Sequence, residues 1–363
     1  MKVIISGGGT GGHIFPAVSI ANELKRQQPD VEILFVGAEG KMEMEKVPSA
    51  GYKIEGLPIR GFQRKLSIKT ITFFYNLLKS MMKARRIVNS FNPDVAVGVG
   101  GYASGPTLRV ATKKGIPSLV QEQNSYAGVT NRILGSKVQK ICVAYEGMET
   151  YFPAEKIVYT GNPVRQDILD LSGKDADAAI HFGLDATKPT ILVIGGSLGA
   201  RAINEAIFYH LEDFTYNNVQ LIWQTGKSYF PKVKDKVDFY RKKGIVITEF
   251  IKRMDYAYAL ANIIVSRAGA GTISELALVG KPVILVPSPY VAEDHQTKNA
   301  MALVNKKAAV LIKEQDADLI SKEIFQLFKD VDLMKSLGDN IKQFARPDAA
   351  KNIVAEILKL AKR

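Results

Sequence analysis

A strand, a run of glycines and a helical pattern follow one another at the start of the chain, and this unit constrains the fold more than any other feature. Residues 2–6 predict a buried strand, residues 7–12 include five glycines, and the spacing of apolar residues over 17–24 predicts a helix. The same order returns at 190–194 and 195–201. Such turns are typical of parallel α/β domains, in which helix N–H groups point at a bound phosphate. The recurrence predicts two similar domains rather than one large sheet.

The length of the chain fits this division. Its 363 residues suffice for two domains of ordinary size, each with its own core. We expect a Rossmann-like domain over 1–163 and a second over 164–343, because the turn-forming cluster at 161–163 interrupts the pattern. We also expect residues 344–363 to form a helix that returns to the first domain, and Pro16 to lie in the first turn of the first helix.

Composition excludes several classes of protein. The single cysteine, Cys142, lies in an apolar run and cannot form an internal disulfide, and no apolar run reaches the ~20 residues that span a bilayer. We therefore expect a protein of the reducing cytoplasm. The four histidines are too scattered for a zinc site, and the Asp-x-Asp triplets lie away from the glycine turns. We expect neither a metal ion nor a cofactor.

Positive charge is concentrated in one segment. The net charge is +13, and no acidic residue stands between Glu55 and Asp94. An anionic membrane surface attracts such a basic, aromatic-rich segment, but a core helix with a solvated basic face has the same pattern, so both interpretations stay open. No nucleic-acid motif accompanies the charge, and we expect no nucleic-acid partner. The basic residues of the interval are Arg60, Arg64, Lys65, Lys69, Lys79, Lys83, Arg85 and Arg86.

The first glycine turn fits the dinucleotide pattern G-x-G-x-x-G through Gly7, Gly9 and Gly12. A dinucleotide enzyme also needs an acidic residue at the end of the second strand to bind the ribose, and Glu39 is displaced from that position. His13, directly after the glycines, has no role in that scheme. It suits either a general base that removes a proton from a hydroxyl, or a structural histidine that bonds the loop.

A third strand, glycine turn and helix occupy residues 263–275. Thr272 and Glu275 have the spacing of a capping box, in which the glutamate bonds the start of the helix. A carboxylate at the same place also suits the two hydroxyls of a ribose. One residue cannot readily do both, so these interpretations compete.

Seven motifs in this order resemble the MurG family, the bacterial UDP-N-acetylglucosamine transferases of peptidoglycan synthesis. The resemblance spans nearly the whole chain. It implies the GT-B fold, an α/β architecture of two Rossmann-like parallel-sheet domains with the donor in the cleft between them. The motifs are GGTGGH at 8–13, GGYASGP at 100–106, EQN at 122–124, GNPVR at 161–165, GGSLGAR at 195–201, SRAGA at 266–270, and Gln296 with Asn299 and Ala300.

The resemblance implies an inverting reaction on two substrates. N-acetylglucosamine would pass from UDP-N-acetylglucosamine to the 4-hydroxyl of N-acetylmuramoyl-pentapeptide carried on undecaprenyl diphosphate. His13 would be the catalytic base, with Glu122 in reserve. An anionic membrane surface at the cytoplasmic face of the cell membrane and other cell-wall synthesis proteins would be its partners.

The resemblance also implies which residues bind the substrates. Thr10, Gly11 and Gly12 would line the phosphate and acceptor side, with Tyr102 and Ser104 near the acceptor. The residues that would bind the donor are Asn124 and Gln296 at the sugar, Arg165 and Ser197 at the diphosphate, Ile251 at the uracil and Glu275 at the ribose, together with Ala270, Gly271 and Thr272. Two positions depart from the family: Gln121 replaces a usual histidine and Leu198 a usual glutamine, so those side-chain roles are not carried over.

Two other functions stay open at this point. A UDP-N-acetylglucosamine epimerase would share the two-domain architecture but needs no second substrate. A non-catalytic nucleotide-binding scaffold at the membrane would bind the donor without turnover. Release of UDP that depends on a lipid acceptor distinguishes a transferase from both.

Overall fold

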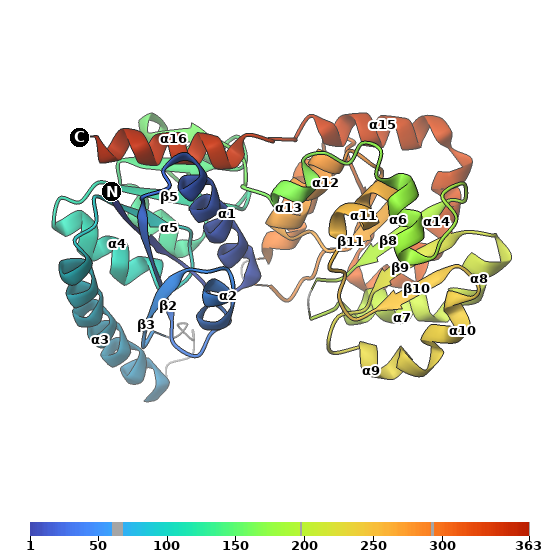
Figure 1. The fold of residues 1–363 in the computed structure, drawn as a ribbon, viewed down its shortest axis with the longest axis horizontal. Helices are drawn as coiled ribbons and strands as arrows, with labels where there is room; N and C mark the ends of the chain where they lie inside the picture. Colours follow the sequence, from blue (N-terminus) through green and yellow to red (C-terminus); the bar gives the residue numbers. More distant parts are fainter. Residues whose placement is uncertain (60–67, 197, 292–293, 363) are drawn as a thin grey trace. The chain divides into compact units, whose positions relative to one another are not determined.

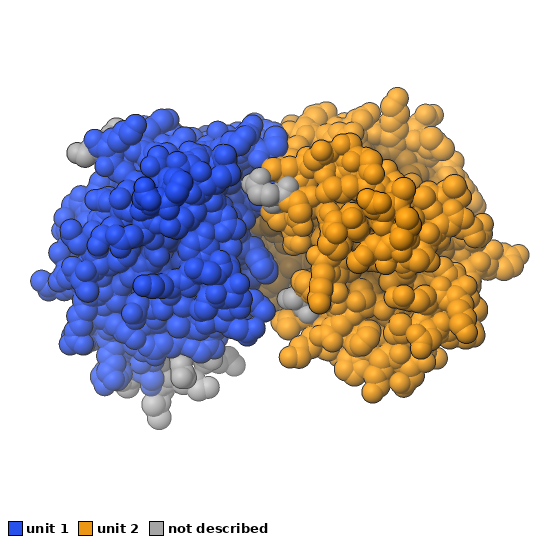
Figure 2. All heavy atoms as spheres, in the orientation of Figure 1, with its two compact units in different colours: residues 1–164, 346–363 blue, residues 165–345 orange. Residues whose placement is uncertain are grey.

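The computed structural model describes residues 1–59, 68–196, 198–291 and 294–362. It divides into two compact units, residues 1–164 with 346–363 (unit 1) and residues 165–345 (unit 2), which Figure 2 distinguishes by colour. Each unit has a parallel sheet with helices on its faces (Figure 1). The predicted α/β class with two Rossmann-like domains is confirmed.

Unit 1 contains a seven-stranded parallel sheet in the order β3-β2-β1-β4-β5-β6-β7. The order reverses direction between β1 and β4, and ligands of such sheets bind at this switch point, beyond the carboxyl ends of the strands. Its elements are β1 Lys2–Ser6, α1 Gly11–Gln27, β2 Glu32–Ala38, α2 Glu43–Ser49, β3 Lys53–Leu57, α3 Ile68–Phe91, β4 Val95–Gly98, α4 Ser104–Lys113, β5 Ser118–Glu122, α5 Val129–Gly135, β6 Lys140–Val143, β7 Ile157–Tyr159 and α16 Ala349–Ala361.

Two apolar layers cover this sheet, because side chains alternate between its faces. Val3 and Ile5 of β1 pack in the layer that includes residues of α1 and α16, whereas Ile4 packs in the layer that includes residues of α3. All three side chains are fully buried. A strand buried on both faces needs a continuous apolar run, and the run at residues 2–6 therefore predicts β1.

Helix α16 belongs to unit 1 although it ends the chain. It lies beside α1 (Figure 1), and Ile353, Val354, Ile357 and Leu360 are buried in the same layer as Val3. Their spacing places them on one face of the helix. The chain therefore completes the core of its first unit with its last helix.

Unit 2 contains a six-stranded parallel sheet in the order β10-β9-β8-β11-β12-β13, with its switch point between β8 and β11. Its elements are α6 Asp175–Phe182, β8 Thr190–Ile194, α7 Arg201–Tyr209, α8 Leu211–Tyr216, β9 Gln220–Gln224, α9 Phe230–Val233, α10 Val237–Arg241, β10 Ile245–Thr248, α11 Met254–Leu260, β11 Ile263–Ser266, α12 Ala270–Val279, β12 Val283–Leu285, α13 His295–Val304, β13 Val310–Leu311, α14 Ile320–Lys329 and α15 Val331–Lys342.

One local prediction about the first helix is wrong. Helix α1 begins at Gly11, so Pro16 lies in its second turn rather than its first. The helix starts early because the N–H groups of His13 and Ile14 donate to the carbonyl of Thr10, at 3.1 and 3.2 Å. Proline at position 16 removes the donor that would otherwise bond Gly12, a loss of one hydrogen bond close to the helix start.

Among the helices of the described residues, we find none that combines the length and the hydrophobicity of a transmembrane span.

Candidate functional site

The glycine loops after β1 and β4 meet at the switch point of unit 1. Gly101 has a φ of 82°, and a Cβ there would lie 2.2 Å from the carbonyl oxygen of Gly8. Only glycine fits a backbone conformation of this kind at such a close approach. The two loops therefore touch through their backbones and form one surface beyond the ends of the central strands.

His13 lies on this surface, in the first turn of α1. Its Nδ1 lies 3.0 Å from the carbonyl oxygen of Gly8 and 3.2 Å from Oγ1 of Thr10. A carbonyl oxygen only accepts hydrogen bonds, so Nδ1 carries the hydrogen in the neutral ring and Nε2 is the basic nitrogen. The Nε2 edge lies over Gly100, where a Cβ would come within 2.9 Å of Cδ2 and Nε2. The ring is thus held in the tautomer that a general base needs.

A buried carboxylate, which the sequence did not single out, fills the inner side of the same loop. Glu43 is 1% exposed and accepts the N–H of Gly9 at 2.9 Å and the N–H of Ala38 at 3.0 Å. In a dinucleotide enzyme these groups would face the pyrophosphate and the ribose. Here the protein's own negative charge occupies the position, which argues physically against dinucleotide binding by this loop.

Glu122, the expected reserve base, ends β5 and is 2% exposed. One carboxylate oxygen accepts from the backbone N–H and the side-chain amide of Asn124, at 3.0 and 3.2 Å. The other accepts from the N–H of Gly128 and the amide of Asn131, at 3.0 and 2.9 Å. A carboxylate bound by four donors holds a loop in place, so this geometry supports a positioning role and leaves His13 as the better-placed base.

Gln121, which departs from the family pattern, is buried beside Glu122 and is part of a network of amides. Its Nε2 donates to Oδ1 of Asn162 at 2.8 Å, and Nδ2 of Asn162 donates to the carbonyl of Gln123 at 3.0 Å. These bonds join the end of β5 to the turn that precedes unit 2. At the position of the usual histidine, an uncharged amide therefore holds two loops together through hydrogen bonds.

The remaining residues expected in unit 1 differ in exposure. Thr10 and Tyr102 are exposed, Tyr102 at 48%, and Gly11 and Gly12 follow Thr10 at the start of α1. Ser104 is fully buried, and its hydroxyl lies 2.7 Å from the carbonyl of Gly100 and 3.0 Å from that of Ser6. This arrangement supports a structural role for Ser104 instead of contact with an acceptor.

In unit 2 the glycine loop after β8 packs against the end of β9. Gly199 has a φ of 84°, and a Cβ there would lie 2.2 Å from the carbonyl oxygen of Thr225. Helix α7 begins directly after this loop, at Arg201, and its first N–H groups are oriented to favour an anion. Ser197, the expected diphosphate ligand in this loop, lies outside the described residues.

Glu275 projects from α12, and both of its carboxylate oxygens have partners. Arg165 Nε donates to Oε1 at 3.0 Å, and the hydroxyl of Tyr258 on α11 donates to Oε2 at 2.9 Å. The capping-box interpretation is wrong, because α12 begins at Ala270 and its N-cap is Gly269, a residue without a side chain, rather than Thr272. Glu275 is therefore not used to cap its own helix, and each of its two oxygens can accept a further hydrogen bond from a ligand.

Burial dominates the electrostatics of this group. It raises the pKa of Glu275 above its ordinary value, although Arg165 and Tyr258 oppose the change. Burial alone would lower the pKa of Arg165, but the nearby Glu275 and Tyr258 outweigh this and raise it. The pKa of Tyr258 is also raised, first by burial and then by the charge of Glu275. Tyr258 thus keeps its hydrogen and donates it to the carboxylate.

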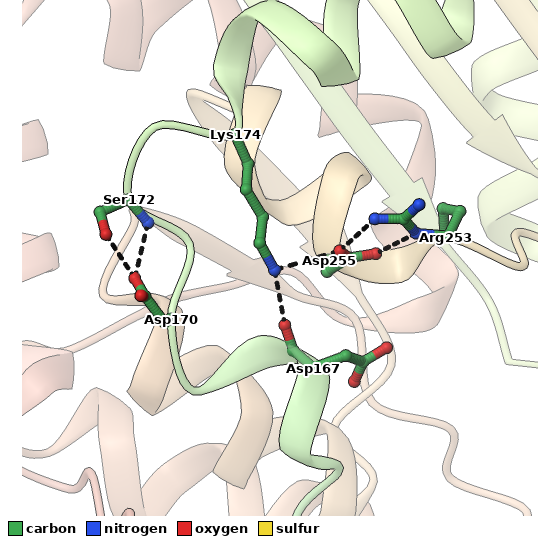
Figure 3. Close-up of polar contacts among 6 residues, drawn as sticks. All are labelled: Asp167, Asp170, Ser172, Lys174, Arg253 and Asp255. Atoms are coloured by element: carbon green, nitrogen blue, oxygen red, sulfur yellow. Dashed lines mark hydrogen bonds and ion pairs between the residues drawn. The ribbon is translucent and has the colours of Figure 1, made fainter.

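A second ionic cluster fastens the segment that follows Arg165 (Figure 3). Lys174 Nζ donates to the carbonyl of Asp167 at 3.0 Å and to Asp255 at 3.1 Å, and Arg253 binds Asp255 through two nitrogens, at 2.9 and 2.7 Å. Hydrogen bonds from Arg253 hold the pKa of Asp255 well below its ordinary value, against the effect of burial. The start of unit 2 is thereby tied to α11, the helix that carries Tyr258.

Two further residues expected at the donor site bond within the protein. The N–H of Ile251, expected at the uracil, donates to Oε1 of Gln224 at 2.9 Å, and Nε2 of Gln224 donates to the carbonyl of Gly196 at 3.2 Å. Gln224 is buried and links the loops after β8 and β10, a role that the sequence did not indicate. Gln296 accepts the N–H of Ser288 at 2.8 Å.

The N-terminal turn of α12 contains the other three expected residues of unit 2. Ala270 is 8% exposed, whereas Gly271 and Thr272 are partly exposed. Apart from its own helix, a Cβ added at Gly271 would meet no atom of the described residues within 4 Å, so among these residues there is open space beside this turn. Asn124, expected at the donor sugar, belongs to unit 1 and bonds Glu122.

Known proteins share both halves of this arrangement. Residues 3–143 match the glycosyltransferase family 28 N-terminal domain, and residues 190–359 match the glycosyltransferase family 28 C-terminal domain. A relative from Parabacteroides distasonis is 56% identical over 361 residues, 99% of this chain and 98% of the relative. It is named UDP-N-acetylglucosamine--N-acetylmuramyl-(pentapeptide) pyrophosphoryl-undecaprenol N-acetylglucosamine transferase. The chain belongs to the MurG family.

A solved MurG structure agrees with this assignment. The crystal structure of MurG from Acinetobacter baumannii is 29% identical, covers 99% of both chains and superimposes with a TM-score of 0.77. The chain is accordingly a hexosyltransferase with the GT-B fold. UDP-GlcNAc 2-epimerase from Neisseria meningitidis matches 99% of this chain and 100% of its own at 16% identity, with a TM-score of 0.68. That likeness shows a shared fold alone.

Proposed function

We propose that this MurG-family enzyme transfers N-acetylglucosamine from UDP-N-acetylglucosamine to the 4-hydroxyl of N-acetylmuramoyl-pentapeptide on undecaprenyl diphosphate. The observation that carries the proposal is the full-length 56% identity to a relative named for this reaction. Each unit also has a glycine loop at its switch point, which supports the proposal. Unit 1 adds His13, held in one tautomer by Gly8, and unit 2 adds the pair of Glu275 and Arg165.

Unit 2 binds the donor in this proposal. The two oxygens of Glu275 suit the two ribose hydroxyls, and its partly exposed side chain leaves room for them, at 16% exposure. Arg165 already uses Nε for Glu275, and its two terminal nitrogens remain suited to a bidentate contact with the diphosphate. One guanidinium would then link recognition of the ribose to that of the phosphates. Ser197 and the start of α7 would complete the diphosphate site, with Ile251, Gln296 and residues 270–272 around the uracil and sugar.

His13 removes the proton in this proposal. The acceptor oxygen attacks the anomeric carbon from the side opposite UDP, the new carbon–oxygen bond forms as the bond to the diphosphate breaks, and the proton passes to Nε2. The bond from Nδ1 to Gly8 holds the ring in place and stabilises the imidazolium that results. Arg165 and the N–H groups at the start of α7 offset the charge that develops on the departing UDP.

The loops of unit 1 position the acceptor in this proposal. Thr10, Gly11, Gly12 and Tyr102 line its side of the site, and Glu122 holds the loop that presents Asn124 to the donor sugar. This assigns Glu122 to positioning, in line with the four hydrogen bonds that occupy its carboxylate.

Helix α3 brings the enzyme to the cytoplasmic face of an anionic membrane in this proposal. Four exposed apolar side chains recur along one face, at 55–65% exposure: Phe74, Tyr75, Leu78 and Met82. Lys79, Arg85 and Arg86 are exposed on the same helix, whereas Ala84, Ile87 and Val88 pack in the core. Such a combination suits the membrane interface. The basic residues 60–65 of the same segment lie outside the described residues.

Flotation with liposomes tests the membrane surface. Replacing Lys79, Arg85 and Arg86 by glutamine should reduce binding to anionic vesicles, and added salt should reduce the binding of the unmodified protein. Lys232, Lys234 and Lys236 of unit 2 provide a matched control that removes the same charge. Equal binding by the two triple variants would contradict the proposed role of α3.

Acceptor-dependent release of UDP tests the reaction itself. The protein is incubated with UDP-N-acetylglucosamine, with and without a short-chain analogue of the lipid acceptor, and free UDP is measured. The proposal predicts UDP only when the acceptor is present. Conversion of the sugar nucleotide without an acceptor would indicate an epimerase, and donor binding without turnover on any lipid acceptor would indicate a scaffold.

A further inference from the structure

The hydroxyl of Tyr258 has a single described partner, Oε2 of Glu275. Tyr258 is fully buried on α11, and its hydroxyl lies 2.9 Å from that oxygen on α12. A buried hydroxyl is costly without a partner, and a hydrogen bond to a carboxylate is among the stronger ones that a tyrosine forms. The contact therefore ties the orientation of Glu275 to a rigid part of the core.

The other oxygen of Glu275 is held from a different direction. Arg165 Nε donates to Oε1 at 3.0 Å, and the side chain of Arg165 is 40% exposed, in contrast to the buried tyrosine. An exposed arginine can move when a ligand arrives, whereas the fully buried Tyr258 is held by the close packing of the core around it. Of the two partners, Tyr258 is the one that can keep the carboxylate in a fixed plane while a ligand binds.

We propose that Tyr258 is a positioning residue that aims the carboxylate of Glu275 at the ribose hydroxyls of a uridine diphosphate. The inference deepens the proposed function and rests on it. Two oxygens with fixed directions match the 2′- and 3′-hydroxyls of a ribonucleotide, and each accepts one hydrogen. Discrimination between ribose and deoxyribose thus depends on a tyrosine that itself does not touch the nucleotide.

The experiment compares three ligands on the full-length protein: UDP, 2′-deoxy-UDP and 3′-deoxy-UDP. Dissociation constants are measured by calorimetry for the unmodified protein, for Tyr258→Phe and for Tyr256→Phe. Tyr256, two residues earlier on α11, packs against Arg253 and His181 and serves as the matched control. Thermal melts establish that each variant is folded.

We expect a loss of affinity that is confined to the ligand with an intact ribose. The unmodified protein should bind UDP roughly tenfold or more tightly than either deoxy ligand. Tyr258→Phe should raise the dissociation constant of UDP roughly five- to tenfold and change those of the two deoxy ligands by no more than about twofold. Most of the preference for ribose over deoxyribose would then be lost. Tyr256→Phe should keep the preference. Equal weakening of all three ligands by Tyr258→Phe, or no change, would overturn the inference, because a merely structural role acts on all three alike.

A second variant covers the case in which Tyr258→Phe does not fold. Incorporation of 3-fluorotyrosine at position 258 keeps the ring and makes the hydroxyl a stronger donor, so the preference for ribose should change; an unchanged preference would overturn the inference. The unmodified protein separates this inference from the proposed function. If it fails to bind UDP at all, the proposed function fails; if it binds UDP and Tyr258→Phe keeps the full ribose preference, only the role of Tyr258 fails.

Discussion

Replacing Gly100 by alanine should displace the imidazole of His13, the proposed base, although His13 itself is unchanged. Gly100 has a φ of 92°, and the new Cβ would lie 2.9 Å from Cδ2 and Nε2 of His13. Ordinary contacts between such atoms begin near 3.5 Å, so the imidazole must move by about 0.6 Å. Catalytic groups tolerate displacements of only about 0.5 Å, and about 1 Å can cost a hundredfold. We expect kcat to fall roughly 10- to 100-fold, with little change in the affinity for UDP.

A control at Gly51 isolates this effect from backbone strain. Gly51 has a similar φ of 87°, but apart from its chain neighbours a Cβ there would meet no atom within 4 Å in the part of the chain that the structure describes. Both variants should lose about 1–2 kcal/mol of stability because alanine is strained at a positive φ. Initial rates of UDP release at saturating substrates, together with thermal melts, separate the two effects. An unchanged kcat in Gly100→Ala, or an equal loss of kcat in Gly51→Ala, would show that the contact between position 100 and His13 does not govern turnover.

Two further predictions follow from the ionisable groups of unit 2. Burial raises the pKa of Glu275, so as the pH is lowered its carboxylate should take up a proton already above 4.5, the value of an ordinary glutamate. A titration should then show the affinity for UDP decreasing as the pH is lowered through that range, and Glu275→Gln should remove this part of the pH dependence. Asp255 has a lowered pKa, so its pairing stabilises the fold above the ordinary value of 3.8 and is lost as the pH falls through the lowered one. Asp255→Asn should therefore cost about 1–3 kcal/mol at pH 7, the usual range for a buried group that loses its hydrogen-bond partner, and less at pH 3. Denaturant unfolding measures both losses, and equal losses at the two pH values would contradict this.

Much of the fold could be predicted because it depends on local patterns. Strands β1 and β8 have the predicted bounds, since each is a continuous apolar run that ends at a glycine loop. Repetition of that unit predicted two Rossmann-like domains, and the order of the motifs indicated the family. These features survive in a single sequence because backbone geometry and burial on both faces demand them.

Contacts between distant residues could not be predicted in the same way. Glu275 has the spacing of a cap, but Arg165, 110 positions away, and Tyr258 bind its carboxylate, and α12 starts too early for the cap to form. No motif in the sequence indicates Glu43, although its carboxylate binds the N–H groups of Gly9 and Ala38 at the first glycine loop. The packing of several elements decides which polar side chain forms hydrogen bonds with the N–H groups of a buried loop. The local spacing of residues in the sequence does not contain that information.

Transfer of labelled N-acetylglucosamine, compared between the unmodified enzyme and His13→Ala, shows whether the imidazole of His13 is the base. With a short-chain lipid acceptor, the unmodified enzyme should form the β-linked product. The variant should do so roughly a hundredfold or more slowly while binding the donor normally, on the usual scale for loss of a general base. Equal rates for the two proteins would show that the imidazole held by Gly8 is not the base.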